Sequence, residues 1–244
     1  KCELTKRGVE VKKDICEQHQ IAKIFAGTEV VFHLAAESRI GPCIENPSQA
    51  VHTNVVGTCN LLELSRLHGI GRFVYSSTSA CYGLTNTPPY TEDMPRDCLN
   101  PYSVTKLAGE DLVLMYYKLY GLPTVALRYF NVFGERAPSR GPYAPVSGIF
   151  LRQHRAQEPI TIVGDGLQRR DFVHVGDVVD ANIAAALTTE ANGGVFNVGS
   201  GKNCSILDIA KTISDRYEFI PARAGEARDT LADISKLRNI LNCQ

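Results

Sequence analysis

Short runs of apolar residues alternate along the chain with longer stretches in which apolar positions recur every three or four residues. The short runs have the length and the β-branched, aromatic content of buried strands, whereas the longer stretches have the spacing of helices that bury one face. Strands separated by long helices are typical of crossover connections and therefore of a parallel sheet covered by helices. In chain order, these predicted elements cover residues 29–36, 45–69, 72–80, 103–119 and 123–134.

The second half of the chain differs from the first in composition and in the order of its predicted elements. It begins with a segment rich in Pro, Gly and Arg, residues 135–148, which we interpret as a loop that leaves the sheet. Helices and strands alternate again beyond this loop, which indicates a second, smaller α/β unit. The predicted elements are a helix at 147–157, strand-forming residues within 160–175, a helix at 177–188, a strand at 195–201 and a helix from Ser205.

Polar side chains gather where the predicted strands of the first half end. His33 closes the first run, Thr78 lies near the end of the second, and Tyr129 and Asn131 lie in the last part of the third. Ligands of open parallel sheets bind beyond the carboxyl ends of the strands. We therefore expect a binding site at this edge of the sheet.

Composition and charge exclude several classes of partner. The chain has 244 residues, 44% of them hydrophobic, and its 26 basic and 26 acidic side chains cancel. A neutral chain gives no bulk electrostatic reason to bind nucleic acid or an anionic membrane. The eight cysteines are scattered and no C-x-x-C occurs, so we expect neither zinc nor disulfides but reduced thiols in a cytoplasmic protein. No stretch approaches the roughly 20 apolar residues of a membrane span.

One polar segment, NPYSVTK (100–106), places Tyr102 one helical turn before Lys106. Both heads then lie on one helix face, and the ammonium is expected to lower the pKa of Tyr102 from about 10 toward neutrality. The Thr78 hydroxyl, at the end of the preceding strand, can hold a substrate oxygen beside this pair. Such a group of residues can move a proton to or from an alcohol while hydride leaves its carbon.

The motifs and their order resemble the extended short-chain dehydrogenases, specifically the NAD-dependent nucleotide-sugar epimerases and dehydratases. The resemblance implies a doubly wound, Rossmann-type parallel sheet that binds NAD, with a smaller α/β domain for the nucleotide sugar. It places the dinucleotide-binding domain at 1–134 and the nucleotide-sugar domain mainly at 135–244, with about 174–199 returning to the first domain. The matching segments are KKDIC (12–16), VFHLAA (31–36), NVVGT (54–58), SSTSACYG (76–83), YSVTK (102–106), RYFNVFG (128–134) and GDGLQRRDFVHV (164–175).

The resemblance also assigns residues to the site, position by position. It implies that Tyr102 is the base, that Lys106 lowers the pKa of Tyr102, and that Thr78 holds the C4 oxygen of the sugar. The implied cofactor contacts are Asp14, Ile15, Leu34, Ala35, Ala36, Asn54, Tyr102, Lys106 and Tyr129. The implied substrate contacts are Thr78, Asn131, Arg170, Arg223, Glu226, Arg228 and Thr230.

Taken singly, several of these residues have an ordinary structural interpretation. Asp14 could cap a helix, Asn131 could cap its strand, and Arg170 could pair with Asp171. We interpret His33 as a core histidine rather than a catalytic group. For the others, the order of the motifs favours a role in the site.

The residues after Thr78 narrow the reaction. The family's 4,6-dehydratases carry an Asp-Glu pair there, and its UDP-glucuronate decarboxylases keep a Glu, whereas Ser79 and Ala80 occupy these places here. Neither side chain is an acid or base, so dehydration and decarboxylation are disfavoured. The interpretation that remains is oxidation at C4, rotation of the 4-keto sugar and return of the hydride to its other face, with NAD recycled.

The nucleotide end resembles that of UDP-hexose 4-epimerases, most closely those that accept N-acetylated sugars. The resemblance rests on VFGERAPSRGPYAPVSG (132–148) and PARAGEARDTLADISKL (221–237). It implies that Arg170 and Arg223 clamp the diphosphate, helped by Arg228, and that Glu226 accepts hydrogen bonds from the uridine ribose. Thr230 matches a position that is bulky in enzymes restricted to small hexoses, which favours UDP-GlcNAc/UDP-GalNAc over UDP-Glc/UDP-Gal.

The chain departs from the family in one respect. No glycine-rich turn of the type that seats a pyrophosphate occurs in it, so NAD rather than NADP rests on analogy with the epimerases. We expect a sheet without its first βαβ segment, and residues 1–244 alone to be inactive. The alternatives are a UDP-glucuronate 4-epimerase, a 4-keto-sugar reductase and a non-catalytic dinucleotide-binding protein. The family further implies a homodimer that contacts through the helices 45–69 and 103–120.

Overall fold

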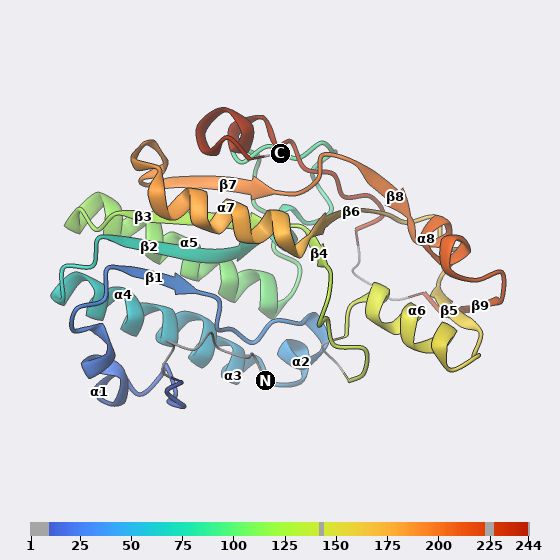
Figure 1. The fold of residues 1–244 in the computed structure, drawn as a ribbon, viewed down its shortest axis with the longest axis horizontal. Helices are drawn as coiled ribbons and strands as arrows, with labels where there is room; N and C mark the ends of the chain where they lie inside the picture. The colour runs from blue at the N-terminus through green and yellow to red at the C-terminus, as the bar shows by residue number, and fades with distance from the viewer. Residues whose placement is uncertain (1–9, 142–143, 223–226, 244) are drawn as a thin grey trace.

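Four parallel strands form the main sheet of the protein (Figure 1). The structure is a computed structural model that describes residues 10–141, 144–222 and 227–243. The strand order is β1-β2-β3-β7, so the two central strands are adjacent in the chain while β7 comes from much later in it. The strands are β1 (Val30–His33), β2 (Arg72–Thr78), β3 (Thr124–Tyr129) and β7 (Gly194–Val198).

Helices cover both faces of this sheet, as the sequence pattern predicts. Because side chains alternate along a strand, Phe73 and Tyr75 of β2 pack toward α4 and α5, whereas Val74 packs toward α7. The predicted helix 45–69 is continuous but contains a π-helical turn between two α-helical parts. The covering helices are α3 (Pro47–Val51), η2 (His52–Gly57), α4 (Thr58–Leu67) and α5 (Pro101–Tyr120) on one face and α7 (Val175–Leu187) on the other.

The long helix α5 begins and ends where its sequence directs. Asn100 is the N-cap, and its side chain accepts a hydrogen bond from the Ser103 amide, while Pro101 occupies the first helical position. Gly121 follows the last turn in the left-handed conformation, with φ of 68°. Gly109 permits close packing, because a Cβ at this position would lie 2.3 Å from the Tyr75 hydroxyl oxygen. The helix is therefore fixed against β2 at both its ends and its middle.

The rest of the chain forms two small sheets with their own core around Phe150, Ile160 and Ile162 (Figure 1). One sheet has the order β4-β6-β8 and the other pairs β5 with β9. Their strands are β4 (Asn131–Phe133), β5 (Ile160–Val163), β6 (Arg169–His174), β8 (Asn203–Ser205) and β9 (Tyr217–Ile220), and their helices are α6 (Val146–Arg155) and α8 (Ile206–Ile213). The remaining short elements are α1 (Gln18–Ile21), η1 (Ala22–Phe25), α2 (Ile40–Glu45), η3 (Ser79–Tyr82), η4 (Thr189–Ala191) and η5 (Leu237–Leu241).

The prediction of one strand over 123–134 is wrong. The stretch divides at Phe130 into β3, which lies in the main sheet, and β4, which pairs with β6 in a small sheet. Phe130 donates its amide to the Val198 carbonyl of β7 and buries its ring in the core, which turns the chain from one sheet into the other.

Within 174–199, β7 pairs with β3 and α7 packs on β2 and β3. The division into two domains at residue 134 stays a prediction. In the described part of the chain, no helix is both long enough and apolar enough to cross a bilayer.

Candidate active site

Tyr102 lies in the first turn of α5, which the Asn100 cap holds beside the carboxyl end of β2. Its phenol is half-buried, and the Thr78 side chain is close enough to act on its pKa. Burial raises the pKa of Tyr102, and the Thr78 hydrogen bond and the Arg39 guanidinium act in the opposite direction. The two hydroxyls that the sequence predicts as catalytic are thus brought together.

Thr78 is the last residue of β2, in extended conformation, and is almost completely buried. Its Oγ1 accepts a hydrogen bond from the Ala80 amide at 3.2 Å, which caps the short helix η3. The side chain therefore has a fixed position where the sheet ends and η3 begins. In β2 and β3, Thr78 is paired with Tyr129, so the two predicted site residues lie side by side at the strand ends.

Lys106 is buried under the main sheet, with 3% of the residue exposed. Its Nζ lies 4.3 Å from the centroid of the Tyr75 ring, and among the described residues no group accepts a hydrogen bond from it. Burial lowers the pKa of Lys106 to about 7, and the nearby Glu110 carboxylate acts against this lowering.

The expected lowering of the Tyr102 pKa by Lys106 is wrong for this structure. Burial dominates at Tyr102 and raises its pKa, and the cation that acts on its phenol is Arg39. The physical reason is that burial penalises the charged form of both groups. With a pKa of about 7, Lys106 is itself only partly charged near neutrality and exerts a weaker field than a fully protonated lysine.

Asn54 joins the loop after β1 to α5. It is buried in the π-helical turn η2, where its Nδ2 donates to the Glu37 carbonyl at 3.0 Å and to Thr105 Oγ1 at 2.9 Å. Its Oδ1 accepts from the Glu37 amide at 2.8 Å. Asn54 thus holds residues 34–37 against the turn of α5 that carries Lys106, and π-helical turns often mark functional sites.

His33 is a core histidine, as the sequence analysis proposes. It is 2% exposed and its Nε2 lies 2.8 Å from Thr58 Oγ1. Burial lowers the pKa of His33 to about 3, so the ring is neutral at physiological pH. It takes no part in the proton chemistry proposed below.

The residues predicted to contact the cofactor lie along the same edge of the sheet. Leu34 and Ala35 are exposed immediately after β1, and Tyr129 is half-buried at the end of β3, where its hydroxyl pairs with Asn182. Asp14 is exposed and accepts from the Cys16 amide in a local turn. Ile15 packs against Gly57, and Ala36 is half-buried.

These residues fit a dinucleotide. Exposed apolar side chains after β1 can contact a flat ring system, and the three donors of the Lys106 ammonium are available for the hydroxyls of a ribose. Leu34 and Ala35 follow β1 directly and Tyr129 ends β3, at the carboxyl ends of parallel strands, where nucleotides bind in such sheets.

The residues predicted to bind the substrate surround β6 in the smaller half. Asn131 donates from Nδ2 to the Asp171 carbonyl at 3.0 Å, and the Thr230 amide donates to the Arg169 carbonyl at 3.1 Å. The half-buried Arg170 donates to two backbone carbonyls, whereas the exposed Arg228 forms an ion pair with Asp165 at 2.7 Å. Arg223 and Glu226 lie outside the described residues.

Sequence reasoning overlooked the role of Asp171, treating it only as a partner for Arg170. Its fully buried carboxylate accepts hydrogen bonds from the Ser200 amide at 2.7 Å, the Ser200 hydroxyl at 2.8 Å, the Gly201 amide at 3.1 Å and the Ala232 amide at 3.1 Å. A carboxylate with several donors joins β6 to two distant segments. The available signal was the alternation of side chains along β6, which places Asp171 on the same buried face as Val173.

A cavity of about 560 Å³ lies elsewhere, against the outer side of α5. Its wall includes Glu92, Arg96, Glu110, Asp111 and Arg128 but none of the predicted site residues. Many of its charged groups are already paired with one another, which leaves little for a ligand to bind. Among the described residues, no group of three His, Cys, Asp or Glu side chains could hold a metal ion.

Comparisons with known proteins agree on one family. Residues 4–199 match the model of the NAD dependent epimerase/dehydratase family. A UDP-glucose 4-epimerase of Mycolicibacterium smegmatis is 37% identical over 224 residues, which cover 88% of this chain and 71% of the relative.

Solved structures agree with this match. The UDP-glucose 4-epimerase of Thermotoga maritima, solved with UDP-glucose, superposes with a TM-score of 0.94 at 30% identity and covers 99% of this chain and 80% of the other. The UDP-N-acetylglucosamine 4-epimerase of Methanobrevibacter ruminantium, in complex with UDP-N-acetylmuramic acid, superposes with a TM-score of 0.91 at 32% identity, covering 96% and 76%.

Proposed function

The chain belongs to the NAD dependent epimerase/dehydratase family, and from this premise we propose that it inverts C4 of a UDP-sugar through a transient 4-keto intermediate. The observation that carries the proposal is the placement of the Thr78 hydroxyl, at the end of β2, close to the phenol of Tyr102, with Lys106 one helical turn further along α5. A binding protein has no need of a proton-transfer pair at this place. The residues at this site therefore favour an enzyme over a protein that only binds a dinucleotide.

Tyr102 accepts the proton of the C4 hydroxyl while Thr78 holds the C4 oxygen. When bound, NAD would supply the hydride acceptor and donor for C4, so that no net oxidation would take place. Tyr102 then returns its proton to the C4 oxygen. Because burial favours the neutral phenol, ionisation of Tyr102 requires a cation nearby, and Arg39 is the described side chain whose charge acts on the phenol.

The residues after Thr78 favour epimerisation over dehydration. The Ala80 amide binds Thr78 Oγ1, and Ser79 and Ala80 carry no ionisable group. Elimination of water from the sugar needs a further acid and base close to C5 and C6. Residues 79 and 80 provide neither the acid nor the base. The residues near Thr78 therefore support proton transfer at C4 rather than elimination of water.

The smaller half supplies the nucleotide end of the site in this proposal. Arg170 and Arg228 would bind the diphosphate through charge-assisted hydrogen bonds, which for Arg228 means giving up its ion pair with Asp165. Thr230, a small side chain on the same segment, leaves space for an N-acetyl group at C2. UDP-GlcNAc/UDP-GalNAc is thus the proposed pair.

We also propose a cytoplasmic homodimer. Apolar side chains are exposed along α3, α4 and α5, including Val51, Leu67, Val104 and Leu119, and a second copy would cover them. All seven cysteines among the described residues are free thiols, as in a reducing compartment. Sedimentation velocity tests the assembly, since a monomer at micromolar concentration would contradict it.

The proposed function is tested by incubating the protein with NAD and, separately, UDP-Glc, UDP-GlcNAc and UDP-GlcA. Proton NMR distinguishes the two C4 epimers by the coupling of H4 to its neighbours. We expect inversion of C4 with no accumulation of NADH, and the fastest inversion for UDP-GlcNAc. Loss of water or of CO₂ from the sugar, or stoichiometric consumption of the cofactor, would contradict the proposal.

A further inference from the structure

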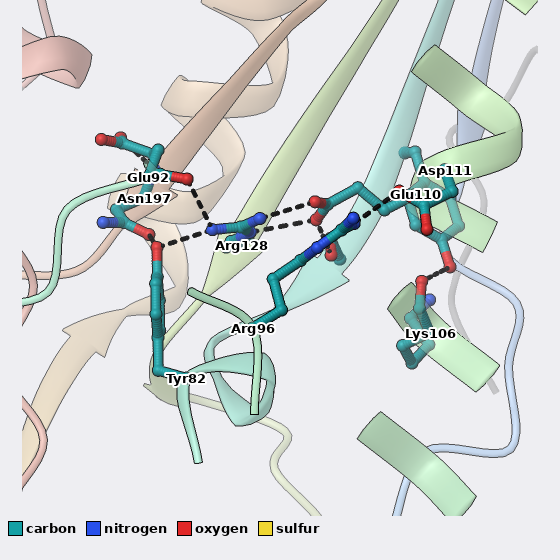
Figure 2. A network of polar contacts seen from close by, with 10 residues as sticks. Tyr82, Glu92, Arg96, Lys106, Glu110, Asp111, Arg128 and Asn197 are labelled. Carbon is teal, nitrogen blue, oxygen red and sulfur yellow. Dashed lines mark hydrogen bonds and ion pairs between the residues drawn. The ribbon is translucent and has the colours of Figure 1, made fainter. Parts of the chain in front are cut away.

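A buried ion pair joins Arg128 to Glu110, one helical turn beyond Lys106 on α5 (Figure 2). Arg128 of β3 donates from Nη2 to Glu110 Oε1 at 2.7 Å and from Nε to Glu110 Oε2 at 3.1 Å. Only 3% and 1% of the two side chains are exposed. The proposed mechanism does not use either residue.

The pair is connected to every strand around it. Ser77, the neighbour of Thr78 in β2, donates to Glu110 Oε2 at 2.5 Å. Arg128 Nη1 donates to the Tyr82 hydroxyl at 2.9 Å, and that hydroxyl donates to Asn197 Oδ1 of β7 at 2.6 Å, as Figure 2 shows. The carboxylate of Glu110 thus ties α5 to the strand that ends in Thr78.

The position of Glu110 on α5 relates it to the site. Tyr102, Lys106 and Glu110 follow one another at intervals of four residues and therefore lie on one face of the helix. Glu110 is the last of the three, one turn beyond the lysine. Its charge favours the protonated form of Lys106, against the effect of burial.

Stability does not explain the pair. Two charges removed from water lose hydration that their attraction only roughly repays, and well-packed apolar residues often replace such a pair without loss. Here the pair also serves its neighbours, because Glu110 accepts from the buried Ser77 hydroxyl and Arg128 donates to the Tyr82 hydroxyl, and an apolar pair would leave both contacts unmade.

We propose that Glu110 is a positioning residue for the reaction: its carboxylate increases the share of Lys106 in the ammonium form and, through Ser77, ties α5 to β2, so that Tyr102 stays close to Thr78. The proposal rests on the proposed function.

The other groups that face Lys106 cannot replace Glu110. His33 of β1 is neutral because burial lowers its pKa to about 3, and Tyr75 of β2 is neutral because burial raises its pKa. Tyr102 of α5 is the neutral acid that the ammonium must help to ionise. Arg128 carries the opposite charge to Glu110, and of the two it is Glu110 that acts on the pKa of Lys106, which it raises.

The direct test is the titration of Lys106 in protein labelled with ¹³Cε-lysine, with the resonance assigned by its loss in Lys106→Met. In NAD-loaded protein, Glu110→Gln should move the midpoint to lower pH by roughly one unit, which is a tenfold smaller ratio of ammonium to amine. Asp111→Asn is the matched control, because it removes a carboxylate from the next residue of α5, where the side chain is exposed and paired with Arg96. Equal midpoints in Glu110→Gln and the wild type would overturn the proposal.

Turnover gives a second readout that a merely structural role would not move. If Lys106 acts as ammonium, kcat falls as the pH rises through its pKa, and Glu110→Gln should shift this alkaline limb to lower pH, while Glu110→Asp restores it in part. An alkaline limb that stays in place while kcat decreases uniformly would assign Glu110 a structural role and overturn the proposal.

If Glu110→Gln does not fold, the double variant Glu110→Gln/Arg128→Gln removes both charges and leaves neither member of the pair without its partner. Its midpoint should lie below that of the wild type, by less than in Glu110→Gln because the opposing charge of Arg128 is also lost, and an unchanged midpoint overturns the proposal. Absence of epimerisation by the wild type would refute the proposed function alone, since the NMR titration does not depend on turnover.

Discussion

The two halves of the molecule hold their functional side chains in different ways. In the half built on the main sheet, Thr78, Tyr102 and Lys106 lie on a strand end and on one capped helix, and two of the three are almost completely buried. In the smaller half, Arg228 is exposed and Arg170 half-buried, and both are held by hydrogen bonds to irregular segments.

The difference follows the task of each half. Proton transfer needs groups whose positions and pKa values are fixed, which burial and regular structure provide. Recognition of a particular sugar nucleotide needs side chains that can exchange one partner for another, and the exposed ion pair of Arg228 with Asp165 can do so at little cost. Substitutions in the first half should therefore change kcat, and those in the second half KM.

The largest effect is expected for Tyr102→Phe. Without the phenolic oxygen no base accepts the C4 proton. We expect kcat to fall by about 10³-fold or more, as is usual when the group that transfers the proton is removed. NAD should remain bound, because the ring still packs at the start of α5. Tyr120→Phe, at the exposed end of the same helix, is the control and should leave kcat unchanged.

Lys106→Met should abolish activity yet stabilise the NAD-free protein. The unfolded chain protonates Lys106 near pH 10.5 and the folded protein only near pH 7, so the wild type loses stability as the pH falls between these values. Methionine has no such proton. Urea unfolding should show that the advantage of the variant grows from pH 10.5 to pH 7, to roughly 4 kcal/mol, and then stays constant; an advantage independent of pH would contradict burial of the charge.

Asp171→Asn tests whether the smaller half depends on one buried carboxylate. The amide group of Asn must point toward amides that donate, which leaves a buried donor unpaired and should lower the free energy of unfolding by about 1–3 kcal/mol. Because the segments of Ser200 and Ala232 carry Thr230 and its neighbours, KM for the UDP-sugar should rise more than kcat falls. Asp177→Asn, exposed in α7, should do neither.

The smallest effect is expected for Arg228→Gln. Loss of one charge-assisted contact to the diphosphate should raise KM about tenfold with kcat and thermal stability unchanged, since the ion pair with Asp165 is exposed. Arg152→Gln, which removes another arginine of the smaller half, is the matched control. A fall in kcat with KM unchanged would contradict the division of tasks between the halves.

The sequence predicted most accurately those features that residues close together in the chain determine. The helix at 103–119 carries its cap, its first-turn proline and its terminal glycine in the sequence itself, and Tyr102 and Lys106 follow from it. The main-sheet strands were equally visible because each contains a short run of β-branched or aromatic residues. His33 as a core residue followed from its place at the end of such a run.

What the sequence did not predict depends on contacts between distant residues. The break at Phe130 arises from its hydrogen bond to Val198, which lies 68 residues further along the chain. The role of Asp171 depends on amides of Ser200 and Ala232. The pKa of Tyr102 was predicted in the wrong direction because the depth of burial cannot be read from the spacing of two side chains.

The most direct test of the central claim, that Thr78, Tyr102 and Lys106 carry out a reversible oxidation at C4, uses UDP-GlcNAc deuterated at C4. NMR of the product reports both the configuration of C4 and the fate of the label. We predict that the wild type inverts C4 with the deuterium retained there, and that Tyr102→Phe does not convert the substrate at a comparable rate. Loss of the deuterium to solvent, or equal conversion by Tyr102→Phe, would contradict the account.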